Sequence, residues 1–329
     1  ALRDYGFPYL MLHRADLQMV LARALDREAP GAILPGRKVV GVRQAADAVT
    51  VTLADGETVS GALLVGADGV HSAVRSAVAP PARATFTGCM AWRGIVPAER
   101  LPVRLRTRAG INWVGPGRHV VTYPLRRGEL INFVGVVERG DWIEESWTER
   151  GSREECHRDF EGWHPDVHTL IDAVDEHFRW ALLSRPTLER WSAGRVVLLG
   201  DACHPMLPFM AQGAVMAMED GCVLARAIAA HPDTPGEAFA AYEAARVGRA
   251  NRCVAAADRN RQVFHAEQLS HAADAERYVA QQWSETKVRE RYDWLFRYDA
   301  LACPVGRAQP APAVAAAVRA TSPGEHHAA

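Results

Sequence analysis

The amino-acid sequence predicts an α/β protein that combines an incomplete Rossmann-like domain, an antiparallel β-sheet domain and a helical C-terminal region. Two short apolar runs, residues 62–65 and 195–199, each lead into a turn that contains Asp and Gly, as strands do at the ligand-binding edge of an α/β sheet. Short strand-like segments lie between the two runs. Segments rich in Ala, Glu, Arg and Gln, which favour helix, follow the second run.

The N-terminal part is predicted to contain a helix followed by strands. Apolar residues recur at helical spacing over residues 13–25, and Asp55-Gly56 is a turn signal that favours a hairpin or meander. The strand candidates carry alternating or continuous apolar side chains and are 38–43, 49–53, 58–59 and 62–65. Because its apolar run is continuous, the last candidate is expected to be buried on both faces of its sheet. A short helix is expected over residues 71–78.

The rest of the chain changes character twice. Residues 80–185 carry strand candidates separated by Gly, Pro and Arg, which predicts an antiparallel sheet. A strand at 195–199 and a helix at 212–230 then return to the Rossmann-like domain, and two helices are expected over 237–260 and 263–288. The predicted boundaries are 1–79 and 186–235 for the two parts of the Rossmann-like domain, 80–185 for the sheet domain, 236–303 for the helical region and 304–329 for a disordered tail rich in Ala and Pro.

Composition limits the classes of function. Lys and Arg total 38 and Asp and Glu total 39, so the formal net charge of −1 argues against nucleic-acid binding. No apolar run approaches the roughly 18 to 20 residues of a membrane span, and no secretory signal is visible. The six cysteines form no CxxC pair, which predicts free thiols in the cytoplasm and no zinc site or disulfide framework. The sequence leaves the oligomeric state open, with a homodimer as the assembly to test.

Two motifs indicate a ligand site at one sheet edge. The first runs from Gly66-Ala67-Asp68-Gly69 to Arg75, and the second from Gly194 through Gly200-Asp201 and Pro208 to Gln212-Gly213. A carboxylate at the carboxyl end of a strand can accept hydrogen bonds from ligand hydroxyl groups, and glycine lets the backbone approach a ligand closely. The helix that begins near Gln212 directs its N-terminal N–H groups to the same edge, where they favour negative charge.

Together, these motifs resemble the second and third fingerprints of the FAD-dependent aromatic hydroxylases, which include the hydroxybenzoate, salicylate and 6-hydroxynicotinate monooxygenases. The resemblance extends over residues 13–299 and includes His13-Arg14-Ala15-Asp16-Leu17 near the start and residues 292–299 near the end. It implies a class A flavin monooxygenase that uses FAD, NADH or NADPH, and O2 to hydroxylate a small aromatic acid. The predicted sheet domain, residues 80–185, would then bind the substrate.

The resemblance also implies roles for individual residues. The positions that match cofactor contacts are Arg14, Asp68, Arg75, Asp201, Pro208, Gln212 and Gly213. Arg14 matches an arginine that contacts the flavin phosphate or ribityl region, and Asp201 matches the ribityl-binding aspartate. Asp68, with Arg75 as an assisting cation, would lie near the pyrophosphate and the path of the nicotinamide nucleotide. The backbone at Pro208 would lie against the reactive edge of the flavin ring.

One feature of the family is missing. The family begins with a strand, a GxGxxG turn and a helix, and no GxGxxG occurs in this chain. That turn supplies the cradle for the phosphates. The sequence therefore predicts either a fragment of a longer gene product or a remnant of a flavin site.

His119 and Tyr123 are the candidate catalytic residues. They are four positions apart in a strand-like run, so they share one face of the strand and could orient an aromatic acid or its phenolate. The pattern resembles the His and Tyr on the substrate-facing strand of the hydroxybenzoate and hydroxynicotinate enzymes. The alternative is a hydrogen-bonded histidine and a tyrosine that packs in the sheet. Phe209 and Met210 are candidate walls of the substrate pocket, with helix packing as their alternative.

Two other functions compete with aromatic hydroxylation. One keeps the fold and FAD but changes the reaction or substrate, as in an epoxidase or another oxidoreductase. A halogenase is disfavoured because the only lysines are Lys38 and Lys287, and neither lies in a motif. The other is a truncated, non-catalytic remnant of the flavin fold.

Overall fold

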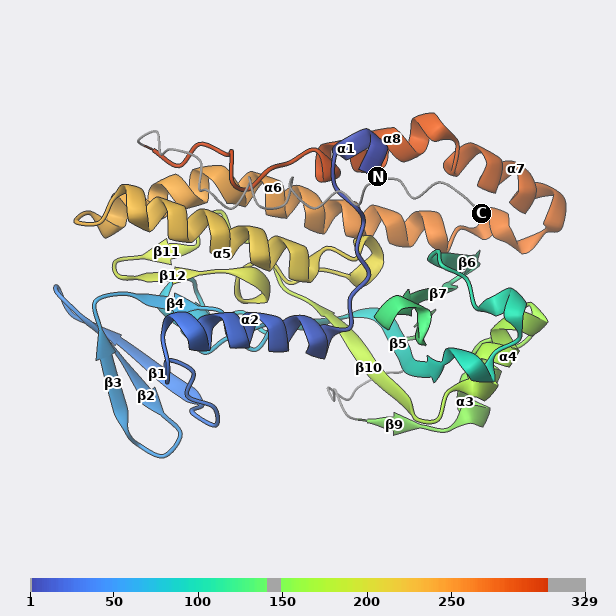
Figure 1. Ribbon diagram of the computed structural model, residues 1–329, viewed down its shortest axis with the longest axis horizontal. Coiled ribbons are helices and arrows are strands. Elements are labelled where there is room, and N and C mark those ends of the chain that lie inside the picture. The colour runs from blue at the N-terminus through green and yellow to red at the C-terminus, as the bar shows by residue number, and fades with distance from the viewer. Residues whose placement is uncertain (1, 141–148, 307–329) are drawn as a thin grey trace, which may run out of the picture.

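The structure is a computed structural model that describes residues 2–140 and 149–306 (Figure 1). Within these residues the chain forms sheets of three, six and three strands, with helices packed around them. The first sheet consists of β1 (Val39–Gln44), β2 (Val49–Leu53) and β3 (Thr58–Gly61). These strands pair as an antiparallel meander, as the sequence predicts.

The second three-stranded sheet carries both motifs. It consists, in spatial order, of β11 (Ser192–Ala193), β12 (Val196–Leu198) and β4 (Leu64–Gly66). β12 and β4 are parallel, so both end at the same edge. A Cβ at Gly66 would lie 2.7 Å from side-chain carbons of Leu198 and Val74, so the close packing here requires glycine. β12 is fully buried, but Val65 is 40% exposed. The expectation that β4 is buried on both faces is wrong, because the described residues leave the face that carries Val65 uncovered.

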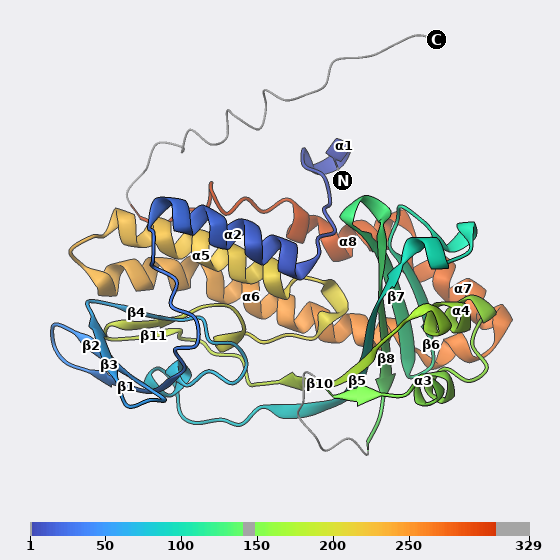
Figure 2. The same ribbon diagram turned by 60° about the horizontal axis from the view of Figure 1, so that its bottom comes forward.

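The helix expected over residues 13–25 forms as α2 (Arg14–Glu28), after the short helix α1 (Leu2–Tyr5). No residue of α2 is buried. Its apolar positions instead face solvent, and Met19, Val20, Leu21 and Leu25 are each more than 40% exposed. Figure 2 shows α2 on the outside of the molecule. The helical spacing is therefore present without the partner surface that such an apolar face normally packs against.

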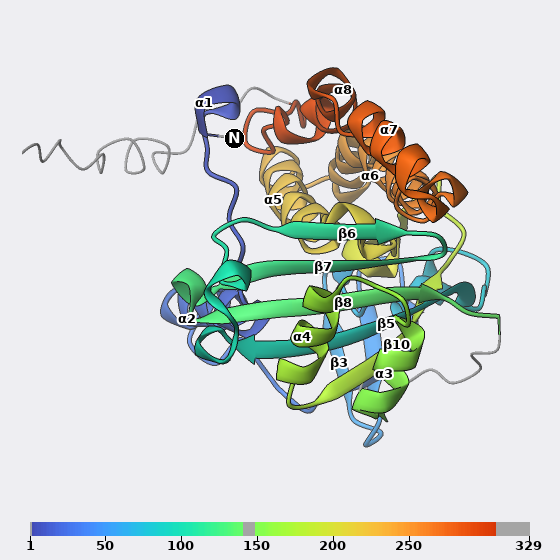
Figure 3. The same ribbon diagram turned by 90° about the vertical axis from the view of Figure 1, so that its right-hand side faces the viewer.

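The six-stranded sheet is antiparallel, as the sequence predicts for residues 80–185. Its spatial order is β6-β7-β8-β5-β10-β9. The strands are β5 (Thr85–Pro97), β6 (Ile111–Gly115), β7 (Arg118–Leu125), β8 (Leu130–Glu138), β9 (Arg150–Gly151) and β10 (His177–Ser184). Helices α3 (Arg153–Asp159) and α4 (Pro165–Ala173) cover one face (Figure 3). The other face packs on the loop after the second motif and on the C-terminal helices.

The helix expected over residues 212–230 forms as α5 (Gly213–Ala230), which lies alongside the long α6 (Pro235–Phe264) (Figure 1). The single helix expected over 263–288 is wrong. After α6 the chain forms a short 3-10 turn, then α7 (Ala272–Gln282) and α8 (Glu285–Phe296). The break between α7 and α8 has a local cause, because the Ser284 hydroxyl accepts a hydrogen bond from the backbone of Lys287 and starts a new helix.

Two smaller expectations have different outcomes. The short helix expected over 71–78 is a 3-10 turn at Val74–Ala77. The predicted start of the disordered tail, residue 304, is placed too early. Val305 is only 3% exposed and packs in the core around β12, α5 and α6. Residues 307–329 of that tail lie outside the described residues. Among the helices that the structure describes, none is long and apolar enough to cross a membrane.

Candidate active site

The two motif loops meet at the edge where β4 and β12 end. Arg75 joins them directly: its guanidinium donates 2.8 Å to the carbonyl of Ala202 and 2.9 Å to that of Pro186. Burial, followed by the charge of Arg185, holds the pKa of Arg75 below its usual value. The predicted cofactor residue Arg75 therefore fixes the relative position of the two loops, a contact between distant segments that the sequence did not show.

Asp68 organises the first motif. Its carboxylate accepts hydrogen bonds from the Ser72 hydroxyl at 2.5 Å and from the backbone N–H of Ala73 at 2.7 Å and Val74 at 3.2 Å. The side chain therefore holds the start of the 3-10 turn. It also remains exposed at the surface.

Asp201, the central residue of the second motif, lies in the 3-10 turn Gly200–Ala202 that follows β12. It is exposed, yet partial removal from water raises its pKa, opposed by the nearby positive charge of His204 and Arg14. One carboxylate oxygen lies 3.9 Å from where a Cβ on Gly213 would be. The first N–H groups of α5 donate no hydrogen bond to the side chain of Gln212, which is the N-cap residue and is itself buried.

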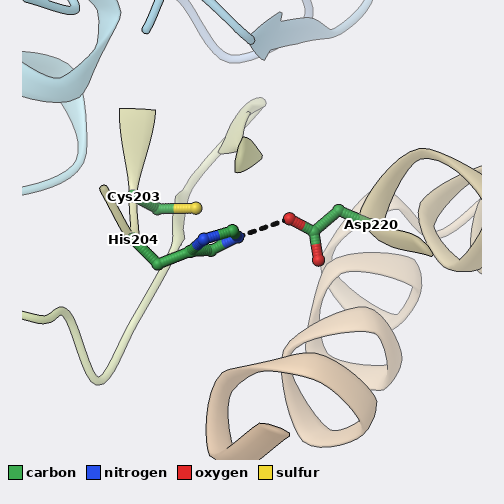
Figure 4. Close-up of side chains that lie close together, drawn as sticks. All are labelled: Cys203, His204 and Asp220. Carbon is green, nitrogen blue, oxygen red and sulfur yellow. Dashed lines mark hydrogen bonds and ion pairs between the residues drawn. The ribbon is translucent and has the colours of Figure 1, made fainter. Parts of the chain in front are cut away.

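A buried hydrogen-bonded cluster behind Asp201 fixes the second motif. His204 Nε2 lies 2.6 Å from Asp220, which comes from α5 (Figure 4). Asp220 also accepts from the backbone N–H of Gly200 at 3.0 Å and from Arg246 of α6 at 2.8 Å. Burial alone would raise the pKa of Asp220, but His204 and Arg246 outweigh it and hold that pKa below its usual value. The cluster therefore ties the strand end to both long helices.

The same cluster contains a set of potential metal ligands, namely Cys203, His204 and Asp220, whose ligand atoms lie within 4.8 Å of one another. Its chemistry does not fit a metal. Both oxygens of Asp220 already accept hydrogen bonds, from Arg246 on one side and from His204 and Gly200 on the other.

The loop before α5 packs against the six-stranded sheet. Pro208 is exposed, whereas Phe209 and Met210 are 6% and 5% exposed and belong to the core between the sheet and α6. Asn260 donates 2.9 Å to the carbonyl of Phe209 and so fixes the loop. Ala211 takes a left-handed backbone conformation, with φ of 52°, directly before the helix. The two expected pocket walls thus point mainly into the core.

His119 and Tyr123 lie on the same face of β7, the face toward α6, as their spacing predicts. His119 packs edge-on against Phe209, with ring centroids 5.0 Å apart, whereas Val120 belongs to the opposite core beneath α3 and α4. The structure does not bring the two side chains together, because four residues of strand span about 13 Å. His119 Nδ1 lies 2.7 Å from His265 Nε2, and burial holds the pKa of His119 well below its usual value.

Tyr123 has a different neighbour, Arg93 of β5, which the sequence did not single out. Burial raises the pKa of Tyr123, opposed by the positive charge of Arg93, and burial lowers the pKa of Arg93, helped by the charge of Arg14. The Arg93 guanidinium stacks 4.1 Å from the centroid of the Trp180 ring. Among the described residues, no carboxylate forms an ion pair with Arg93. The sequence signal that could have identified Arg93 is the period-two alternation of β5, which puts it on the same face as Ala91, toward α6.

Two motif loops at one sheet edge, with the six-stranded antiparallel sheet beside them, are the arrangement expected of a flavoprotein. A family model described as an FAD binding domain matches residues 6–257, and the chain belongs to that family. The 6-hydroxynicotinate 3-monooxygenase of Pseudomonas fluorescens is 40% identical over 77% of the chain and 66% of its own length. The 3-hydroxybenzoate 6-hydroxylase of Polaromonas naphthalenivorans is 35% identical over 91% and 74%.

Three further relatives have similar names or ligands. A 3-amino-4-hydroxybenzoate 2-monooxygenase of Streptomyces platensis is 35% identical over 92% of the chain and 74% of its own length. A salicylate hydroxylase in complex with its substrate superposes with a TM-score of 0.71 at 25% identity, over 88% of this chain and 73% of that one. Klebsiella pneumoniae HpxO with FAD and uric acid superposes with a TM-score of 0.72 at 30% identity, over 89% of this chain and 72% of that one. By their names, four of these relatives are monooxygenases or hydroxylases, and HpxO holds FAD and uric acid. The chain spans 66 to 74% of their lengths.

Proposed function

We propose that this chain forms the greater part of an FAD-dependent monooxygenase that hydroxylates a small aromatic acid. The observation that carries the proposal is Arg93, a half-buried cation on the α6-facing side of the six-stranded sheet, with no carboxylate partner among the described residues. A buried charge is costly unless a counter-charge accompanies it. The carboxylate of an aromatic acid would supply that counter-charge, beside the Tyr123 hydroxyl.

The residues present fit FAD. Asp201 would accept hydrogen bonds from ribityl hydroxyl groups, and Arg14, whose charge reaches Asp201, would face the phosphate side. The absence of a Cβ at Gly213 leaves room for the cofactor against the uncapped start of α5. Bound FAD would supply electron transfer from a nicotinamide nucleotide and activation of O2. The chain's own residues would bind and orient the substrate and exclude water.

A recess beside the first motif suits the phosphates of NADH or NADPH. It has a volume of about 310 Å³ and is lined in part by Ser72, Arg75, Arg83 and Arg185. Arg75 is only 3% exposed and donates to backbone carbonyls, so Arg83 and Arg185 are the lining arginines that would contact a phosphate. Arginines arranged without acidic partners favour phosphate oxygens.

The test compares an aromatic acid with its neutral amide. The full-length gene product would be supplied with FAD, NADH or NADPH, and hydroxybenzoates or hydroxynicotinates, and product would be measured per nucleotide oxidised. We expect hydroxylation of the acid, and we expect Arg93→Met to raise KM for the acid at least tenfold while leaving KM for the amide nearly unchanged. The exposed Arg158→Met, on α3 at the opposite face of the sheet, is the matched control. An enzyme that handles acid and amide equally well would contradict the proposed substrate class.

A further inference from the structure

Two histidines from neighbouring helices face each other on the side of the six-stranded sheet that lies away from α6. His157 of α3 and His168 of α4 bring their Nδ1 atoms to within 2.8 Å, and their rings are nearly parallel, with an interplanar angle of 11°. Both residues are half-buried. Figure 3 shows the two helices together on this face of the sheet. We call His157, His168 and their neighbour Asp172 the α3–α4 histidine cluster.

The core beneath the helices holds both histidines in position. Cys156 and Val167, which directly precede His157 and His168 in the chain, are completely shielded from solvent and pack in the core under α3 and α4. Side chains on anchored helices are held more precisely than side chains on loops. The close approach of the two rings therefore follows from how the helices pack on the sheet.

Asp172 determines which nitrogen of His157 carries a proton. Its carboxylate oxygen lies 2.9 Å from His157 Nε2. A carboxylate can only accept, so the neutral His157 ring is protonated at Nε2 and presents the lone pair of Nδ1 toward His168. His168 must then donate from its own Nδ1. One proton therefore lies between two imidazole nitrogens.

A metal ion can take the place of that proton. Neutral imidazole nitrogens are good ligands for Zn²⁺ and other divalent transition metals. Two Zn–N bonds of about 2.0 to 2.1 Å at a tetrahedral angle place their nitrogens about 3.4 Å apart, so the two Nδ1 atoms at 2.8 Å would have to separate by roughly half an ångström. Small rotations of two half-buried side chains provide this movement. Water would occupy the remaining coordination positions.

We propose that the α3–α4 histidine cluster binds a divalent transition-metal ion such as Zn²⁺, with the Nδ1 atoms of His157 and His168 as its protein ligands. His168 exchanges its Nδ1 proton for one on Nε2, so both rings stay neutral and no net proton is released. Asp172 keeps its hydrogen bond to His157 Nε2, and carboxylates in that place orient ligating histidines and make them more basic. The ion would join α3 to α4 on the face of the sheet opposite the candidate active site.

The cluster differs from the buried set of Cys203, His204 and Asp220 in its access to water. There, Asp220 is completely shielded and already accepts from three donors. Here the His157 side chain is 30% exposed and the Asp172 side chain 60%. An ion can therefore arrive at the α3–α4 histidine cluster with part of its hydration shell.

The first test measures zinc binding by isothermal titration calorimetry, with the full-length gene product carrying no affinity tag. His326 and His327 lie outside the described residues and also have zinc-binding side chains, so both are replaced by Gln in every protein compared. We expect one Zn²⁺ per chain. Asp172→Ala should weaken binding roughly 10- to 100-fold, and His157→Gln and His168→Gln should each weaken it at least as much.

Two exposed residues supply the controls. His271→Gln removes a histidine at the start of α7, and Asp175→Ala removes a carboxylate just after α4. Both proteins should bind zinc as tightly as the reference protein. Zinc should also raise the melting temperature of the reference protein by mass action, but not that of the double variant His157→Gln/His168→Gln.

The second test identifies the ligand atoms without altering the cluster. In protein labelled with 15N-histidine, zinc should shift the Nδ1 resonances of His157 and His168 and leave a proton on Nε2 of each ring. Because the cluster is intact, this result does not depend on whether a variant folds. Coordination through Nε2 of either ring would overturn the proposed geometry.

The remaining outcomes also decide the proposal. Equal zinc affinity in the reference protein and in His157→Gln/His168→Gln would show an adventitious ion elsewhere on the chain. Absence of zinc uptake would show that the two histidines only form a hydrogen bond. Either result would refute the metal site. None of these measurements uses FAD or an aromatic acid, so the proposed function is tested separately.

Discussion

His204 and Asp220, both completely shielded from solvent, form a 2.6 Å hydrogen bond that joins the second motif to α5. Asp220 simultaneously pairs with the buried guanidinium of Arg246. With the backbone N–H of Gly200, three groups therefore share the buried carboxylate of Asp220. Such a cluster fixes geometry, and its value depends on every partner being present.

Replacement of this carboxylate should be strongly destabilising. In Asp220→Asn the buried Arg246 loses one of its two counter-charges, while Glu219 at 2.6 Å remains. The loss should lower the free energy of unfolding by about 3 kcal/mol. Urea unfolding followed by circular dichroism measures this. The control is Asp55→Asn, which removes an exposed ion pair to Arg37 and should change the free energy little. Equal effects of the two substitutions would show that the buried cluster has no special role.

The same carboxylate predicts a pH dependence. The pKa of Asp220 in the folded protein lies below its ordinary value of 3.8, so the unfolded chain binds a proton more readily. The stabilisation is therefore complete above the unfolded pKa and is lost as pH falls through the folded pKa. Unfolding free energies measured from pH 6 down to pH 3 should decrease more steeply for wild type than for Asp220→Asn. Parallel curves would contradict the assignment.

Asp201 should control affinity for FAD. Asp201→Ala removes a charge-assisted hydrogen bond to the ribityl chain, of order 1.5 to 3 kcal/mol, which corresponds to a loss of roughly 10- to 150-fold in affinity. Flavin fluorescence titration of the full-length protein measures it. The control is Asp233→Ala, which replaces an exposed aspartate just before α6. Wild-type affinity in Asp201→Ala would refute the ribityl assignment.

The uncovered face of α2 gives a further prediction. The chain with the present sequence should bind the dye ANS and retain FAD poorly, because Val20, Leu21 and Leu25 expose apolar surface next to the expected cofactor site. Leu21→Gln combined with Leu25→Gln should reduce dye binding without lowering stability. The matched control is the exposed polar residue Gln18→Ala. Tight, stoichiometric FAD in this chain would show that α2 needs no covering segment.

The sequence predicted local structure better than contacts between distant segments. The meander, the antiparallel sheet and α5 followed from apolar periodicity and turns. α3 and α4 were missed because they are short, although the Ser152–Glu155 capping box and Pro165 at a helix start were local signals for them. At the site, period two correctly placed His119 and Tyr123 on one face. Their different partners, His265 and Arg93, come from α6 and β5, and no local pattern in β7 specifies them.

His119 and Tyr123 should each be needed to couple nucleotide oxidation to hydroxylation. They lie on one face of β7 but in separate surroundings, so their substitutions should differ in kind. His119→Ala removes the buried ring beside Phe209 and should lower product formed per NAD(P)H consumed at nearly unchanged substrate affinity. Tyr123→Phe, beside Arg93, should raise KM as well, since an unpaired buried anion is costly.

The decisive measurement is the ratio of hydroxylated product to NAD(P)H, with hydrogen peroxide accounting for the remainder. Thr122→Val is the control. Thr122 is 4% exposed, and because adjacent strand residues point to opposite faces, its side chain lies on the face toward α3 and α4, as Val120 does. That variant should keep wild-type coupling even if it is less stable. If His119→Ala and Tyr123→Phe also hydroxylate with normal coupling and affinity, both residues only pack the sheet. The substrate would then have to bind elsewhere on this face, and Arg93 would lose its proposed counter-ion.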